Sequence, residues 1–81
     1  MDRTSSIRIA VNPEVHFGKP CVVGTRITVQ DVLELVREGI PFDRIVTEYY
    51  NQLTADDIGA CVQFAIDVVA LEDIRLATTE Q

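Results

Sequence analysis

From Val29 onward, apolar residues recur with the period of an α-helix, in three runs separated by short breaks. The runs predict helices over residues 29–38, 41–50 and 55–72. Apolar residues at every third or fourth position give each helix one face that must be buried. Because three such faces can share one core, the pattern predicts a small three-helix domain.

Local signals mark where these helices begin and end. Thr28 and Thr54 stand before the first and third runs, and an aspartate follows each of them three residues later. A threonine in this place caps a helix by accepting a hydrogen bond from a free backbone N–H group. Gly39 is expected to end the first helix in a left-handed conformation. A short glycine-containing turn between two helices is typical of a helix-turn-helix unit.

The N-terminal third has a different pattern. Ile7, Ile9 and Val11 alternate with polar or small residues, and two more short β-prone runs, PCVV and TRITV, flank Gly24. Alternation and turn residues predict a short β ribbon over residues 7–27. The predicted fold is therefore mainly α with a small β element: one domain over residues 1–81, a homeodomain-like or winged helix-turn-helix domain, with a frayed tail at 76–81.

Composition narrows the class of protein. Hydrophobic residues make up 47% of the 81 residues, which is typical of a globular domain. No apolar run reaches the roughly 18 residues of a membrane span, and no signal peptide is evident. Two cysteines provide neither a disulfide framework nor metal-ligand spacing. We expect a cytoplasmic protein that is not bound to a membrane.

Charge is distributed unevenly along the chain. Residues 1–27 hold four basic residues against two acidic ones, whereas residues 28–81 hold three against eleven. Any nucleic acid should therefore meet the N-terminal ribbon. The candidate nucleic-acid-binding residues are Arg3, Arg8, Lys19 and Arg26. The third helix would be the recognition helix of a helix-turn-helix protein, but it contains acidic residues and no Lys or Arg, so we expect DNA binding to be weak.

The third helix has more apolar surface than one core can bury. A first stripe contains Ile58, Cys61, Val62, Ala65 and Val69, and a second runs through Ala60, Phe64, Val68 and Leu71. Leaving a large apolar side chain in water forgoes roughly 1.5–3 kcal/mol. We therefore predict that Phe64, Val68 and Leu71 form a homodimer or partner interface.

The stretch FGKPCVVGTRITV raises the question of a phosphate loop. Its Gly-Lys pair comes first, whereas a P-loop ends with Gly-Lys, so this function is not expected. Most of the stretch is interpreted as structural, together with the later turn and cap residues: Gly18, Pro20, Gly24, Thr25, Arg26, Thr28, Gly39 and Thr54. The roles of Lys19 and Arg26 remain undecided, because each side chain could pair with an acid of the helices or contact a phosphate.

No catalytic constellation is evident, so we do not expect an enzyme. His16 is the single histidine, and it stands five residues from Cys21 without an orienting third group. No cofactor is expected. Ligation of haem or a metal by His16 is kept as a weak alternative.

GKPCVVGTRITV resembles the signature G-x-P-x-[IV]-x-G-T-R-[IV] of the bacterial "domain of unknown function 433" family. The downstream pattern L-x-x-x-G … I-x-x-x-Y-x-x-x-L-T-x-x-D-I also fits, over Leu35, Gly39, Ile45, Tyr49, Leu53, Thr54, Asp57 and Ile58. The chain departs from the family at Pro41, where a capping serine is common, and at Tyr50, where proline often follows the tyrosine. The resemblance implies a helix-turn-helix-like, often dimeric domain of the VapB antitoxin type, encoded beside a PIN-like ribonuclease toxin.

The expected function is therefore that of an antitoxin-like regulatory protein, which binds and neutralises such a ribonuclease and represses its own operon. Glu72, Asp73 and Arg75 of the C-terminal tail are candidate contacts for the toxin. Two alternatives are a dimeric haem- or metal-binding regulatory module using His16, and a stand-alone DNA-binding repressor.

Overall fold

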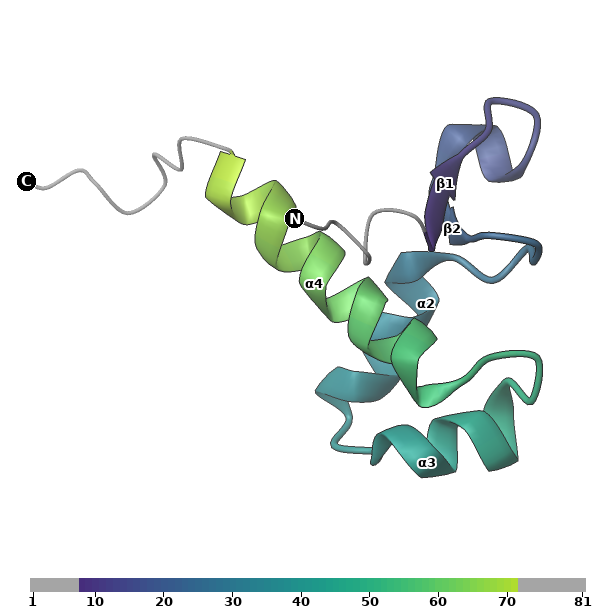
Figure 1. The fold of residues 1–81 in the computed structure, drawn as a ribbon, viewed down its shortest axis with the longest axis vertical. Coiled ribbons are helices and arrows are strands. Elements are labelled where there is room, and N and C mark those ends of the chain that lie inside the picture. Colours follow the sequence, from purple (N-terminus) through teal and green to yellow (C-terminus); the bar gives the residue numbers. More distant parts are fainter. Residues whose placement is uncertain (1–7, 72–81) are drawn as a thin grey trace, which may run out of the picture.

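The computed structural model describes residues 8–71, in which three helical segments pack beside a two-stranded ribbon (Figure 1). Strand β1 (Ile9–Val11) pairs antiparallel with β2 (Pro20–Val22), with Ile9 opposite Val22, and the short helical turn η1 (His16–Gly18) lies between them. The predicted fold class, mainly α with a small N-terminal β element, is confirmed. No helix within residues 8–71 is long and apolar enough to cross a membrane.

The helices lie close to their predicted positions. Helix α2 (Val29–Arg37) is followed by α3 (Phe42–Arg44), which continues directly into the π-helix η2 (Ile45–Tyr49), and α4 covers Ala55–Leu71. The second predicted helix is thus a turn of α-helix followed by a wider π-helical turn. The Tyr50 N–H donates to the Ile45 carbonyl, five residues back, at 2.8 Å. Apolar spacing alone does not distinguish these two helical geometries.

The predicted helix ends are present. The Thr28 hydroxyl accepts a hydrogen bond from the Asp31 N–H at 3.1 Å and caps α2. At the other end of α2, Gly39 has a φ of 87°, and its N–H donates to the carbonyl of Val36 at 2.9 Å. The Ile40 N–H then reaches back to the Leu35 carbonyl at 3.3 Å, which completes a Schellman motif. This motif turns the chain toward α3.

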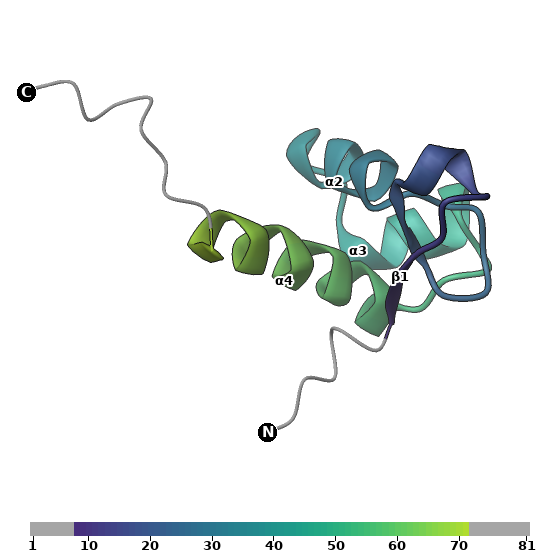
Figure 2. The ribbon, with the colours of Figure 1, turned by 90° about the horizontal axis from the view of Figure 1, so that it is seen from above.

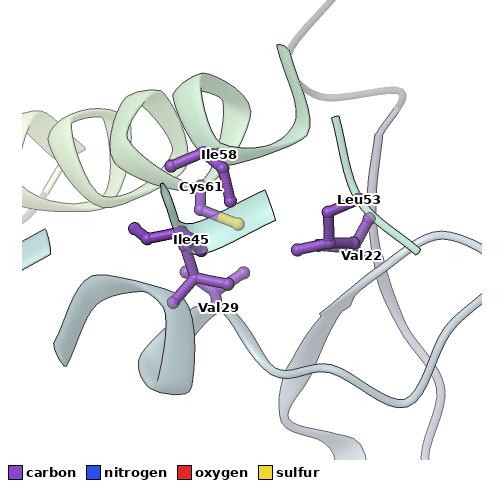
Figure 3. Packing of buried hydrophobic residues seen from close by; sticks show 7 residues of the cluster. Val22, Val29, Ile45, Leu53, Ile58 and Cys61 are labelled. Carbon is purple, nitrogen blue, oxygen red and sulfur yellow. The ribbon is translucent and has the colours of Figure 1, made fainter. Parts of the chain in front are cut away.

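One core joins the ribbon to α2, η2 and α4. Its buried members come from β2, α2, η2, the loop before α4, and α4: Val22, Val29, Val32, Ile45, Leu53, Ile58 and Cys61 (Figure 3). Ile45 and Ile58 are completely buried. Because each element contributes only one or two side chains, no part of residues 8–71 has a separate core.

Helix α4 extends beyond this core. Its N-terminal end lies near the ribbon, where the Arg8 guanidinium contacts Asp57 at 2.9 Å and Asp56 at 3.9 Å. Its C-terminal half projects away from the rest of the domain (Figure 2). The buried residues of α4, which are Ile58, Ala60 and Cys61, all lie in the N-terminal half.

Candidate protein-binding groove

An open groove of about 630 Å³ lies between α2 and the C-terminal half of α4. Its surface is mainly apolar. One wall comes from α2, one from α4, and the end nearest the ribbon from the start of β2 and the α2 cap. The lining residues are Lys19, Pro20, Thr28, Val29, Gln30, Leu33, Glu34, Arg37, Phe64, Ala65, Val68 and Val69.

The α4 wall exists because the helix remains apolar after it leaves the core. Val68 is 39% exposed, Val69 is 59% exposed, and Leu71 at the end of the helix is 86% exposed. A helix that is apolar on several sides is normally covered on all of them. Within residues 8–71, no element covers this part of α4, and the groove is therefore the first candidate for a binding site.

The predicted interface residues divide between the groove and the helix end. Phe64 and Val68 line the groove, whereas Leu71 lies just beyond it. Sequence reasoning missed the α2 wall, since Val29 and Leu33 belong to the apolar face of the first predicted helix, and each such face was expected to be buried in the core. Val29 is buried but still borders the groove, and Leu33 is only partly buried.

Charged side chains flank the apolar surface. Lys19 and Arg37 line the groove and are exposed, as is Glu34. The Glu34 carboxylate accepts a hydrogen bond from the Gln30 amide at 3.2 Å. Arg37 lies 3.7 Å from the carboxylate of Glu38. Two cations and one carboxylate therefore face any occupant, and one of the cations, Lys19, belongs to the ribbon.

The structure separates the predicted nucleic-acid-binding residues from one another. Arg8 is engaged by Asp57, and its side chain is 37% exposed. Lys19 and Arg26 are exposed and form no ion pair with any acid of residues 8–71. Arg3 lies outside the described residues, as do the tail residues Glu72, Asp73 and Arg75. The ribbon thus leaves two of its described cations available to a partner.

Asp57 holds the ribbon against α4. Burial acts to raise the pKa of its carboxyl group, but hydrogen bonds from the Thr54 N–H and the Arg8 guanidinium outweigh burial and lower the pKa below its ordinary value. The carboxylate is therefore ionised and bound at neutral pH. The basic side chain of Arg8 serves here as a structural contact.

The signature residues form a turn that leads into α2. Gly24 has a φ of 81° and lies in a turn closed by the Thr25 N–H, which donates to the Val22 carbonyl at 3.0 Å. The Thr25 hydroxyl donates to the same carbonyl at 2.9 Å and accepts from the Ile27 N–H at 3.0 Å. Thr25 therefore fixes the path of the chain between β2 and the cap of α2.

His16 lies in the β1–β2 connection, is exposed, and has a φ of 49°. Residues 8–71 contain no group of three His, Cys, Asp or Glu side chains placed to hold a metal ion. Cys21 and Cys61 are buried free thiols, and burial raises the pKa of Cys61 to about 11. A thiol with so high a pKa is a poor nucleophile at neutral pH.

A family model described as "Protein of unknown function (DUF433)" matches residues 9–65 of the chain. The match covers the ribbon, α2, α3, η2 and α4 as far as Ala65, so it includes the α2 wall of the groove but ends before Val68 and Val69 of the α4 wall. Comparisons with the curated proteins and with the solved structures gave no match.

Proposed function

The chain belongs to the DUF433 family of proteins of unknown function, and we propose that it is a non-catalytic regulatory protein that acts as a homodimer and neutralises a PIN-like ribonuclease. The observation that carries this proposal is the apolar groove between α2 and α4, next to the exposed apolar end of α4. Such a groove is suited to hold one face of an apolar helix.

The occupant that fits the groove is α4 of a second copy. The same helix forms one wall of the groove and presents unburied apolar side chains, so two copies related by a two-fold axis can cover each other. The charges also match. Lys19 and Arg37 outnumber the one lining carboxylate, Glu34, whereas Asp67 is the single charged residue from 58 to 71, and Glu72 and Asp73 follow it in the sequence.

The proposed ribonuclease partner rests on the resemblance to VapB-type antitoxins and on the acidic surface of the helices. Exposed acids on α2 and its C-cap and on α3, η2 and α4 include Asp31, Glu34, Glu38, Asp43, Glu48 and Asp56. An acidic surface complements a basic RNA-binding cleft. With the groove occupied by the second copy, all of these acids except Glu34, which lines the groove, remain accessible to the ribonuclease.

Repression of its own operon is a second candidate function, favoured by the exposed cations of the ribbon. Lys19 and Arg26 occur twice in a homodimer, whereas the acids at the start of α4 disfavour this helix as a DNA reader. In a mobility-shift assay on the upstream DNA of its operon, we expect Lys19→Ala with Arg26→Ala to abolish the shift. A shift of unchanged affinity would remove the ribbon from any role in DNA binding.

The experiment that tests the main proposal is recovery of the tagged chain from its source cells, followed by an assay of what accompanies it. We expect a small ribonuclease whose cleavage of RNA stops when the purified chain is added in excess. A ribonuclease that continues to cleave RNA, or recovery of the chain without any ribonuclease, would contradict the proposal.

A further inference from the structure

The connection between β1 and β2 presents an aromatic side chain to solvent on left-handed backbone. His16 and Phe17 have φ values of 49° and 57°, and Gly18 follows with a φ of 83°. Side chains with a Cβ disfavour this region, and two such residues in succession are unusual. Phe17 is 99% exposed. We call residues 15–19 the aromatic tip.

Backbone hydrogen bonds hold the aromatic tip in this conformation. The Gly18 N–H donates to the Val15 carbonyl at 3.0 Å, and the Lys19 N–H donates to the His16 carbonyl at 3.1 Å. Phe17 is therefore carried on two consecutive closed turns. Because little backbone entropy is lost when such a side chain is bound, it is well suited to anchor an interface.

Neither the core nor the groove accounts for Phe17. The side chain does not belong to the buried cluster, and it does not line the groove between α2 and α4. Backbone strain persists where the surrounding structure maintains it, and it is concentrated at functional sites. Because this strained residue buries almost no surface within residues 8–71, it points to a contact with another molecule.

The aromatic tip is open to such a contact. In the strand register, Val11 and Pro20 form the pair next to the tip, and Val11 is 59% exposed, which adds apolar surface at this end of the ribbon. Arg8 lies at the opposite end, where it contacts Asp57 at the start of α4. Figure 1 shows the connection at the outer end of the ribbon, remote from α3. A partner can therefore reach the tip without displacing a helix.

The charge around the tip favours a protein over a nucleic acid as the partner. Between Val11 and Val22 the chain has one acid, Glu14, and one base, Lys19, so their formal charges cancel. Nucleic acids are held mainly through their phosphates, which requires an excess of basic side chains. An exposed phenylalanine in a connection without net charge instead fits an apolar pocket of a protein.

Of the two protein partners in the proposed function, the ribonuclease is the one left to receive this side chain. A second copy offers its groove as a hollow for apolar side chains, but in the proposed dimer this groove is filled by α4. The ribonuclease has no such constraint.

We propose that Phe17 anchors the chain to the ribonuclease by inserting its ring into an apolar pocket of that protein. This inference rests on the proposed function and adds a second contact surface to it, besides the acids of the helices. The acids attract the basic ribonuclease over a distance and speed association, whereas the buried phenylalanine slows dissociation.

Inhibition of the ribonuclease by a Phe17→Asn chain tests the anchor. Asparagine tolerates left-handed backbone better than phenylalanine, so the variant keeps the conformation of the tip and loses the ring. Val23→Asn is the matched control, because Val23 is 52% exposed beyond the other end of the strand pairing. The ribonuclease recovered with the tagged chain is titrated with each variant. We expect Phe17→Asn to weaken inhibition of RNA cleavage by about tenfold and Val23→Asn to leave it unchanged.

Thermal unfolding separates an anchor from a residue that serves the fold. Because Phe17→Asn relieves backbone strain, we expect it to unfold at a temperature no lower than the unmodified chain. Inhibition as tight as that of the unmodified chain would overturn this inference alone, and so would a lower unfolding temperature, which would assign Phe17 to the fold. An unmodified chain that inhibits no ribonuclease would overturn the proposed function as well.

A photo-cross-link identifies what the ring contacts. The photoreactive residue p-benzoylphenylalanine replaces Phe17 in one chain and Val23 in the control, and each chain is irradiated together with the ribonuclease and RNA. We expect an adduct between the chain and the ribonuclease from position 17 and none from position 23. An adduct with a second copy or with RNA, or no adduct from position 17, would overturn the inference.

Discussion

The carboxylate of Asp57 joins three parts of the structure. It accepts hydrogen bonds from the Arg8 guanidinium and the Thr54 N–H, both at 2.9 Å, and it lies in the first turn of α4. The Asp57 N–H in turn donates to the Thr54 hydroxyl at 3.2 Å. This reciprocal pair is a capping box with aspartate in place of glutamate, and Arg8 adds the ribbon to it.

The lowered pKa of Asp57 predicts a pH-dependent contribution to stability. Its ordinary value is 3.8, and the folded-state pKa lies below it, so the stabilisation is present above about pH 3.8 and is lost as the pH falls through the folded-state pKa. We expect Asp57→Asn to lower the free energy of unfolding at neutral pH and to differ less from the unmodified chain in acid. Urea unfolding at a series of pH values measures this difference. A difference that does not change with pH would contradict this role of the carboxylate.

The cap of α4 can be tested at Thr54. Thr54→Ala removes the hydroxyl that satisfies the Asp57 N–H, and we expect it to lower the free energy of unfolding by about 1 kcal/mol. Thr47→Ala is the matched control, because the exposed Thr47 hydroxyl only donates to the Asp43 carbonyl within a helical turn. Its effect should stay within about 0.5 kcal/mol in the same urea titration. If both variants lost the same free energy of unfolding, the Thr54 cap would not stabilise the fold more than an ordinary helix threonine does.

At the scale of the elements, the sequence predicted the helix ends that are set by interactions between neighbouring residues. Thr28, Gly39 and Thr54 mark helix ends through hydrogen bonds between near neighbours, so their roles could be read without a fold. The π-helical turn of η2 and the left-handed Phe17 could not be predicted. Both depend on where the core and the ribbon oblige the chain to pass, and a phenylalanine gives no signal of positive φ.

Helix α4 shows what the spacing of apolar residues can and cannot predict about burial. Its two stripes correctly indicated an excess of apolar surface, but the division between core and interface does not follow them. Ala60 of the second stripe is buried, whereas Val69 of the first is 59% exposed. What decides burial is the distance along the helix from the core, because α4 leaves the domain at an angle that the sequence does not state.

The groove makes a prediction about two neighbouring positions on α4. Val68→Glu places a charge in the groove lining, and we expect it to make the chain monomeric, since a carboxylate buried against an apolar helix lacks a partner. Ile66→Glu is the matched control: Ile66 is 54% exposed on the same helix and does not line the groove. Sedimentation equilibrium distinguishes the two variants. A dimer that survives Val68→Glu as well as Ile66→Glu would move the interface away from the groove.

At the scale of the whole molecule, the excess of basic residues in the N-terminal third does not form one basic surface. Counting charges along the chain placed four cations in the N-terminal third, and Arg8 turns out to be committed to α4. Lys19 and Arg26 remain exposed, one at the groove and one in the turn before α2. Counting charges in the sequence cannot distinguish a paired cation from an exposed one. Arg8 and Asp57 are 49 positions apart, and only the fold brings them together.

The groove itself was beyond prediction for the same reason. Val29 and Leu33 lie on the apolar face of one predicted helix, and Phe64 and Val68 lie on another. Only the packing of α2 against α4 brings the four side chains to one surface. In the proposed dimer, two copies cover these surfaces for each other.

Sedimentation equilibrium of the unmodified chain tests that claim most directly. At micromolar concentration and near-physiological salt, we predict a species of twice the chain mass. A single species of one chain mass across that concentration range would contradict it.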